Sequence, residues 1–243
     1  MANLHEVKLS QMNEAIKMLG SSTEKYGDPT LERFLINRAM DPKKAAKMFV
    51  EWQKWRTSFV PLGFIPDSEI AEQLEERKIF FQGFSKDGHP VMSLNANKHY
   101  PAKDRDQYKK FIVQFLDKAI ASGMKGKEIG NEKIVAIIDM QNAGYKYVDA
   151  NRLITCIKII QTYYPERLAK LYMLNMPWFF RGVWKMVALA LEKETLDKVM
   201  IVSNEKERTQ FMAEIGEDAL PKEFGGNAKL QAYKDIEARR LQC

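Results

Sequence analysis

Short apolar runs alternate with helical patterns over residues 134–202, and this alternation constrains the fold more than any other feature of the chain. The run IVAII (134–138) is continuously apolar, which is typical of a strand that is buried on both faces of a parallel sheet. Similar runs, LYML (171–174) and VMIV (199–202), follow after intervening helical segments. Two consecutive strand–helix–strand units predict parallel strands that are joined by right-handed crossovers.

About the first seventy residues follow the helical period instead. Asp28-Pro29 and Asp41-Pro42 each place an acidic residue before a proline, which predicts a helix N-cap followed by proline at the first helical position. After Asp41 the apolar residues recur on one helical face, at Ala45, Met48, Phe49, Trp52 and Trp55. An N-terminal helical segment is therefore expected over residues 1–73.

Between this segment and the alternating region the pattern becomes strand-like. KIFFQGF (78–84), the turn KDG (86–88) and HPVMSL (89–94) are typical of two neighbouring strands. Apolar positions within residues 108–119 mark an amphipathic helix, and residues 205–215 form a final helix. The expected fold class is α/β: the helical segment, then a mixed, largely parallel β-sheet with flanking helices.

The chain carries a net charge of +6 and has a pI of about 9.1. Such a charge suits a partner with an acidic surface, either nucleic acid or an anionic membrane leaflet, unless it only keeps the protein soluble. The basic residues are scattered among acids, and no helix-turn-helix, zinc-finger or RNA-binding signature occurs. We therefore expect contact with anionic membranes and no nucleic-acid partner.

The two cysteines, Cys156 and Cys243, make no disulfide framework, which favours a reducing compartment. The stretch MANLHEVKLSQMNEA lacks the apolar core of a signal peptide. The segment PWFFRGVWKMVALAL (177–191) is shorter than the about 20 apolar residues that span a bilayer. A cytoplasmic protein with peripheral membrane association is expected.

Residues that could carry out catalysis are sparse. His5, His89 and His99 are widely spaced and have no metal-ligand partner at a useful spacing. No G-x-S-x-G elbow, P-loop or G-x-G-x-x-G after a strand is present. Asp139 follows the strand 134–138 at the end where α/β enzymes often place chemistry, with turn capping as the alternative. We expect neither an enzyme nor a metal or cofactor site.

The segment 177–191 is too apolar for an ordinary surface helix. Eleven of its fifteen residues are apolar, and it holds two of the chain's four tryptophans. Arg181 and Lys185 share one side of the helix, and nearly all of the remaining circumference is apolar, which exceeds the stripe of about 100° that one core contact uses. The helix is expected either to lie centrally in a large core or to face a removable apolar ligand. In the second case it would meet a membrane on opening, with Arg181 and Lys185 against lipid phosphates.

Several motifs resemble the CRAL-TRIO lipid-binding domain, in particular the phosphatidylinositol transfer proteins. They are YYPER (163–167), the strand and apolar helix that follow it, and the closing LPKEFGG (220–226). LERFLINRAMDPKKAAKMFVEWQKWR (31–56) is similar to the family's N-terminal helices. The resemblance covers roughly residues 28–228, which is most of the chain.

The resemblance implies a sheet floor and helical walls around one apolar lipid cavity, closed by a mobile gate helix at about 177–191. It also implies an N-terminal segment at 1–73, a lipid-binding domain at 74–228 and a C-terminal tail at 229–243. The gate residues expected to contact acyl chains are Trp178, Phe179, Phe180, Val183, Trp184 and Val187.

In the family's phosphatidylinositol carriers, the headgroup is held by an arginine of R-F-L-x-x-R, the glutamate of Y-P-E-R and the threonine and lysine of T-x-x-K. The residues at these positions are Arg38, Glu166, Thr195 and Lys198. Arg38 and Lys198 would donate charge-assisted hydrogen bonds to phosphate. Thr195 would offer a hydroxyl, and Glu166 would accept from inositol hydroxyls. The structural alternatives are a Glu166–Arg167 surface pair and a turn cap at Thr195. Arg38 would then be one exposed basic residue among many.

The expected cavity wall departs from the family pattern. Exchangers of phosphatidylinositol and phosphatidylcholine carry hydroxyls on the strand that leads to the aspartate, where this chain has Ile134 and Ala136, followed by Ile138. Met92 stands where a tyrosine is expected. A phosphocholine headgroup would find few donors there, and burying polar groups without partners costs a few kcal/mol. We therefore expect poor phosphatidylcholine binding and a more apolar second lipid.

The sequence thus predicts a cytosolic protein that binds phosphatidylinositol and exchanges it at membrane surfaces for a second lipid. One alternative is a carrier of a neutral lipid, such as a sterol-like, isoprenoid or tocopherol-like molecule. Another is a lipid-gated scaffold that presents phosphatidylinositol to a lipid kinase or docks a small GTPase. The expected partners are a phospholipid ligand and, transiently, an anionic membrane, and the expected state is a monomer.

Overall fold

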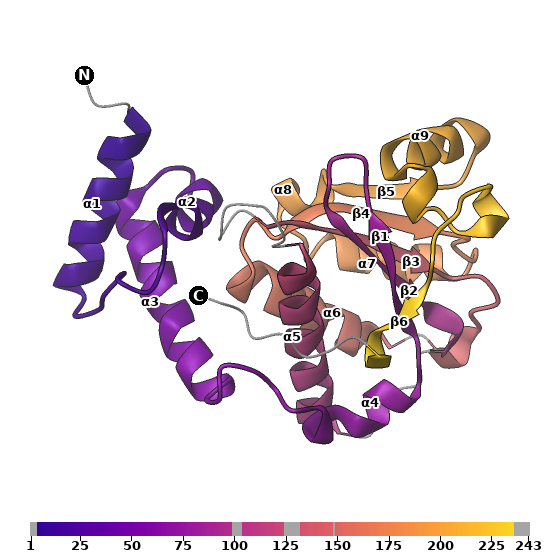
Figure 1. The fold of residues 1–243 in the computed structure, drawn as a ribbon, viewed down its shortest axis with the longest axis horizontal. Coiled ribbons are helices and arrows are strands. Elements are labelled where there is room, and N and C mark those ends of the chain that lie inside the picture. Colours follow the sequence, from indigo (N-terminus) through magenta and orange to yellow (C-terminus); the bar gives the residue numbers. More distant parts are fainter. Residues whose placement is uncertain (1–3, 99–103, 124–131, 148, 236–243) are drawn as a thin grey trace.

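The computed structural model describes residues 4–98, 104–123, 132–147 and 149–235 of the chain. Three helices lie to one side of a six-stranded sheet, in indigo and purple at the left of Figure 1. They are α1 (Leu4–Met18), α2 (Asp28–Asn37) and α3 (Pro42–Phe59).

These three helices share a core of their own. It contains the buried residues Met12, Ile16, Leu31, Phe34, Leu35, Ala45, Ala46 and Phe49. The predicted N-cap of α3 is confirmed, since the Asp41 carboxylate accepts from the backbone N–H groups of Lys43 and Lys44 at 3.1 Å. The prediction for α2 was wrong by one residue. Gly27 is the N-cap, and Asp28 lies within the first turn, where its charge still favours the positive end of the helix dipole.

The sheet has the strand order β5-β4-β3-β2-β1-β6. The strands are β1 (Ile79–Phe84), β2 (Pro90–Asn95), β3 (Ile134–Asp139), β4 (Leu168–Leu174), β5 (Val199–Val202) and β6 (Gln231–Ala232). The pairs β1–β2 and β1–β6 are antiparallel, whereas β2–β3, β3–β4 and β4–β5 are parallel. The two predicted neighbouring strands form an antiparallel pair, and the predicted parallel strands and mixed α/β class are confirmed.

Side chains that alternate along the strands divide the sheet into two packed faces. On one face Val135 and Tyr172 pack with Phe211 and Ile215 of α9 (Glu205–Ile215). The other face carries the remaining long helices, which Figure 1 shows below and behind the sheet. They are α5 (Arg105–Ser122), α6 (Ala150–Tyr163) and α7 (Phe180–Ala188).

Short helices connect these parts. They are η1 (Asp67–Ile70), α4 (Ala71–Glu75), η2 (Ala96–Lys98), η3 (Tyr145–Tyr147), α8 (Lys193–Leu196), η4 (Glu217–Ala219), η5 (Lys222–Phe224) and η6 (Tyr233–Asp235). Among the described residues, no helix combines the length and apolar character needed to cross a membrane.

The apolar helix predicted over 178–191 is shorter than expected. It runs from Phe180 to Ala188, because Pro177 begins a turn before it and the chain turns again after Ala188. It is also not surrounded by apolar neighbours on nearly every side, as was expected. Val187 is its one fully buried residue, while Leu189 just beyond it is 89% exposed. The helix covers the sheet with one face and leaves its other face open.

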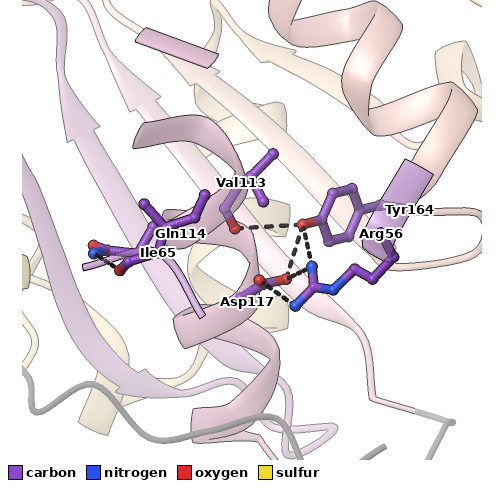
Figure 2. A network of polar contacts seen from close by, with 6 residues as sticks. All are labelled: Arg56, Ile65, Val113, Gln114, Asp117 and Tyr164. Carbon is purple, nitrogen blue, oxygen red and sulfur yellow. Dashed lines mark hydrogen bonds and ion pairs between the residues drawn. The ribbon is translucent and has the colours of Figure 1, made fainter. Parts of the chain in front are cut away.

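A buried ion pair joins the N-terminal helices to the layer of α5 and α6. The guanidinium of Arg56 binds the carboxylate of Asp117 through two hydrogen bonds, at 2.9 and 2.6 Å. The Tyr164 hydroxyl donates to the same carboxylate at 2.8 Å, as Figure 2 shows. Beside this network Trp55 stacks on Tyr163 with ring centroids 3.8 Å apart. The YYPER motif is therefore held directly against α3.

Candidate functional site

A large apolar cavity lies between the sheet and the helices α5, α6 and α7. It contains about 1730 Å³ of space free of atoms, a volume that includes its open mouth. Strand residues that line it include Met92, Leu94, Ile134, Ala136, Ile138, Leu171 and Met173. Helical residues that line it include Phe111, Ile112, Phe115, Leu116, Leu153, Cys156, Ile157 and Ile160.

The four predicted wall residues, Met92, Ile134, Ala136 and Ile138, all line this cavity. The strand register explains why they gather. Met92 pairs with Ala136 across β2 and β3, and Ala136 pairs with Leu171 across β3 and β4. The centre of the floor is therefore a continuous row of apolar side chains.

The predicted gate residues divide into two groups. Phe180, Trp184 and Val187 line the cavity, whereas Val183 is half-buried and is not among its lining residues. The other two predicted contacts lie before the helix, where Phe179 stacks on Tyr145 at a centroid distance of 4.1 Å and Trp178 is 76% exposed. Arg181 and Lys185, predicted to meet a membrane, are both exposed.

A cluster of opposite charges lies at the edge of the sheet where the parallel strands begin. Lys198 Nζ is 3.0 Å from Glu166 Oε2, and Lys133 Nζ is 3.7 Å from the same oxygen. Each residue stands just before a strand, Lys133 before β3, Glu166 before β4 and Lys198 before β5. Because adjacent parallel strands start at the same edge, three segments that are distant in sequence meet there.

Thr195 connects this cluster to the cavity. It lines the cavity, and its carbonyl accepts from the Lys198 backbone N–H at 3.1 Å. Glu166 and Lys198 are each followed by a cavity-lining residue, Arg167 and Val199. The cluster therefore lies beside the apolar cavity, with side chains that can bind phosphate and hydroxyl groups.

The predicted arginine does not join the other three residues. Among the described residues, the hydrogen bond of Arg38 is to the Asn37 carbonyl at 3.4 Å, and none joins it to Glu166, Thr195 or Lys198. Arg33, from the same motif, is only 6% exposed and donates to the carbonyl of Pro165 at 3.1 Å, directly before Glu166. The predicted site did not include Arg33 or Lys133. Arg33 belongs to the motif that was used to name Arg38. Lys133 could have been predicted from its position just before a parallel strand, as for Glu166 and Lys198.

Glu166 has a backbone conformation that is unusual for its residue type. Its φ is +55°, in the left-handed region, where a residue with a Cβ is disfavoured by about 1–2 kcal/mol. This conformation turns the chain sharply between buried Pro165 and the start of β4. Such strain in ordered backbone is often found at binding sites.

Two of the structural alternatives can be compared with the observed contacts. Glu166 does not pair with Arg167, which instead binds the buried carboxylate of Glu132 at 2.5 Å. Asp139 accepts from the Gln141 backbone N–H and from the Asn175 side chain, both at 2.9 Å. This is the turn-capping role proposed as the alternative to chemistry.

The cavity wall also contains two groups that can titrate, the Lys78 ammonium and the Cys156 thiol. The Lys78 ammonium, buried at 2% exposure, donates to Glu76 at 2.6 Å and to Gln73 at 2.9 Å. Its burial lowers the pKa of Lys78 below the usual value. The Cys156 thiol also faces apolar surroundings, and burial raises its pKa to about 12. Cys243 lies outside the described residues. In the part of the chain that is described, no three His, Cys, Asp or Glu side chains gather to hold a metal.

An α/β sheet with an apolar cavity on one face and a polar cluster beside the cavity is the architecture of a protein that binds an amphipathic ligand. The CRAL/TRIO domain family matches residues 74–226. The chain belongs to this family, as the motifs predicted.

Characterised relatives span most of the chain. Sec14 cytosolic factor of Schizosaccharomyces pombe is 25% identical over 238 residues, which cover 92% of this chain and 82% of that protein. The phosphatidylinositol/phosphatidylcholine transfer protein SFH7 of Arabidopsis thaliana is 29% identical over 211 residues, covering 80% of this chain and 38% of that protein. The crystal structure of Sfh5 superposes with a TM-score of 0.69 at 17% identity, covering 91% of this chain and 80% of that one. This last similarity concerns the fold.

Proposed function

We propose that this protein binds phosphatidylinositol and transfers it between membranes in exchange for a second, more apolar lipid. The observation that carries the proposal is the Glu166–Lys198 pair beside Thr195, a residue that lines the apolar cavity of about 1730 Å³. The relatives named for lipid transfer support it. The acyl chains would lie in the cavity, and the inositol phosphate would lie at the polar cluster.

The cluster has the chemistry that this headgroup requires. The Lys198 ammonium would donate a charge-assisted hydrogen bond to the phosphate, and Thr195 would add a hydroxyl. Glu166 would accept from inositol hydroxyls. Of the two arginines in the R-F-L-x-x-R segment, Arg33 is the better candidate for a supporting role, because it holds the backbone beside Glu166. Arg38 would have to move to contribute.

The apolar wall explains why exchange rather than release is the expected activity. A diacyl lipid has on the order of 30 chain carbons at ~0.8 kcal/mol per buried methylene, so exposure to water would cost on the order of 20 kcal/mol. A cavity that encloses the chains offsets nearly all of this cost. Opening of α7 at a membrane would then limit the rate, as conformational steps often do. The outward face of α7, with Arg181, Lys185 and Met186, would meet the lipid surface.

The apolar side chains on the cavity floor favour an apolar second lipid. Ile134 and Ala136 line the cavity floor without a hydroxyl, so a phosphocholine group would find few partners among them. A neutral lipid carrier that does not bind phosphatidylinositol is the second candidate, since the same floor would suit it.

Mass spectrometry of lipids that co-purify with the full chain tests the proposal directly. Phosphatidylinositol and a less polar lipid should be found, with little phosphatidylcholine. Lys198→Ala should lose phosphatidylinositol and keep the apolar lipid, whereas Lys206→Ala, at an exposed position on α9, should keep both. Equal phosphatidylinositol content in the two variants would contradict the proposed headgroup site and favour the neutral lipid carrier.

A further inference from the structure

A second, polar pocket lies between the first turns of α5 and the N-terminal half of α6. Its volume is about 1050 Å³, including its open side. Four basic residues line it, Arg105 and Lys109 from α5 and Arg152 and Lys158 from α6. We call it the α5–α6 pocket. None of these residues belongs to the phosphatidylinositol site proposed above.

The charges in this pocket are only partly balanced. Asp149 is the one acidic residue that lines it, and its carboxylate is bound by Arg152 Nε at 2.8 Å. Lys109 pairs with Asp106 at 2.9 Å. Within the described residues, Arg105 and Lys158 have no ion pair. The pocket therefore presents a surplus of positive charge.

Arg152 supplies an independent sign of a ligand. Its side chain is only 13% exposed, and its guanidinium carbon lies 5.3 Å from the ring centroid of Tyr108. The Nη1 atom is buried and has no hydrogen-bond acceptor among the described residues. A buried guanidinium nitrogen without an acceptor is unfavourable. A shift of the Arg152 side chain toward the pocket would let an anion with several oxygens satisfy it.

The pocket adjoins the end of the apolar cavity that is opposite to the headgroup cluster. Tyr108 and Asp149 line both the pocket and the cavity. The pocket lies where β2 and β3 end, because α5 and α6 follow these parallel strands, whereas Glu166 and Lys198 lie where strands begin. The two polar sites are therefore at opposite edges of the sheet.

Exposed aromatic rings stand at the same strand-end edge as the pocket. Tyr145, between β3 and α6, is 66% exposed, and Trp178, between β4 and α7, is 76% exposed. Their ring centroids are 6.5 Å apart. Tyrosine and tryptophan side chains of this kind favour the interface between membrane and water. A membrane that contacts these rings would bring lipid headgroups to the edge that contains the pocket.

We propose that the α5–α6 pocket binds a phosphate monoester group, such as the one carried by a phosphorylated phosphoinositide headgroup. Arg152 and Lys158 would hold the phosphate from α6, and Arg105 would hold it from α5. The same group exists on water-soluble inositol phosphates, so the experiment must distinguish a membrane lipid from a free ligand.

Sedimentation of the full chain with phosphatidylcholine vesicles tests the proposal, with phosphatidylinositol 4-phosphate as the added anionic lipid. Arg105→Gln/Lys158→Gln should weaken binding roughly thirtyfold, at about fivefold for each basic residue near an anionic membrane. The matched control Lys47→Gln/Lys206→Gln removes two exposed charges from α3 and α9 and should change binding less than about twofold. Arg152→Gln, as a single substitution, should weaken binding about fivefold.

Two further arms identify the source of the phosphate. Vesicles that carry phosphatidylserine at matched surface charge should bind more weakly than those with phosphatidylinositol 4-phosphate. If inositol 1,4-bisphosphate competes with the vesicles, the pocket binds a free inositol phosphate. If the protein binds only the vesicles, the pocket binds the headgroup of a membrane lipid. Equal losses in pocket and control variants, or equal binding to both anionic vesicles, would overturn the proposal. Arg105→Gln/Lys158→Gln should retain the phosphatidylinositol that co-purifies with the protein, so failure here is distinguishable from failure of the proposed transfer function.

Discussion

Lys198 Nζ lies 3.0 Å from Glu166 Oε2, although the two residues are 32 positions apart in the chain. Each stands before a strand of one parallel pair, so the sheet itself brings them together. A phosphate that binds Lys198 must compete with this carboxylate. Lys133, 3.7 Å from the same oxygen, can keep Glu166 balanced while Lys198 turns to the ligand. Binding would then exchange ion-pair partners without leaving a charge uncompensated.

Substitution of Glu166 should separate binding from stability. In Glu166→Gly, relief of the left-handed strain is offset by the greater freedom of glycine in the unfolded chain, so stability should change by less than about 1 kcal/mol. Phosphatidylinositol loading should nevertheless fall about tenfold, because a hydrogen-bonded carboxylate is lost. Urea unfolding and lipid loading measured on the same preparation check both results. Undiminished loading would show that Glu166 does not contact the headgroup.

The double substitution Ile134→Ser/Ala136→Thr should increase phosphatidylcholine loading. Both residues line the cavity, and their new hydroxyls would add hydrogen-bond donors to a part of the floor that is now apolar. Loading from phosphatidylcholine vesicles, followed by lipid extraction, measures the gain. Val135→Thr places a hydroxyl on the same strand but on the face that packs against α9, so it should give no gain. Weak loading of the double variant would count against the proposed role of the apolar floor.

Loss of Arg56 should destabilise the protein in a pH-dependent way. Arg56→Met leaves the buried Asp117 carboxylate without its ion-pair partner, at a cost of about 3 kcal/mol at neutral pH. Burial already raises the pKa of Asp117, and removal of the arginine, which lowers it, should raise it further. The folded state then takes up a proton more readily than the unfolded state. The loss in free energy of unfolding, relative to the unsubstituted protein, should therefore shrink as the pH falls through the raised pKa.

Urea unfolding between neutral pH and pH about 4 measures this effect. The control is Arg56→Met/Asp117→Asn, which has no carboxyl to protonate and should show no such recovery. If the loss of stability in Arg56→Met stays constant with pH, Asp117 is not the titrating group.

The rate at which the Cys156 thiol is labelled should show how easily a water-soluble reagent enters the cavity. Burial raises its pKa from 9.0 to about 12, so at pH 8 its reactive thiolate should be about a thousandfold scarcer than that of an ordinary thiol. In a Cys243→Ser background, labelling by a water-soluble maleimide should be slow and should rise about tenfold per pH unit. Loading with lipid should slow it further. Rapid labelling at neutral pH in the loaded protein would contradict the position of Cys156 on the cavity wall.

Much of the fold was predictable because the positions that become buried in a helix or strand are apolar in the local sequence. The run at residues 134–138 is apolar throughout since β3 is covered on both faces, and its strand assignment is confirmed. The bounds of α9 and the N-cap role of Asp41 are confirmed for a similar reason, because caps and periodicity are local. The length of α7 was not predictable, since its apolar ends, around Trp178 and Leu189, continue the pattern without continuing the helix.

The candidate site was only partly predictable. The motifs named Glu166, Thr195 and Lys198, and the structure brings these three to one place. Motif spacing could not decide between Arg33 and Arg38, because their contacts depend on how α2 meets the turn before β4. The domain boundaries at 73 and 228, the headgroup roles and the gate motion stay predictions.

The sequence by itself determined the order of helices and strands and the parallel strands, because each follows from which side chains must leave water. The apolar cavity floor was implied by the resemblance to the family. Only the tertiary structure decided which charged residues meet. The Glu166–Lys198 pair, the Arg56–Asp117 link and the α5–α6 pocket each join segments far apart in the chain. Hydrophobic periodicity records the burial of a residue, whereas a polar contact depends on the distance between two specific side chains, which exists only in the folded chain.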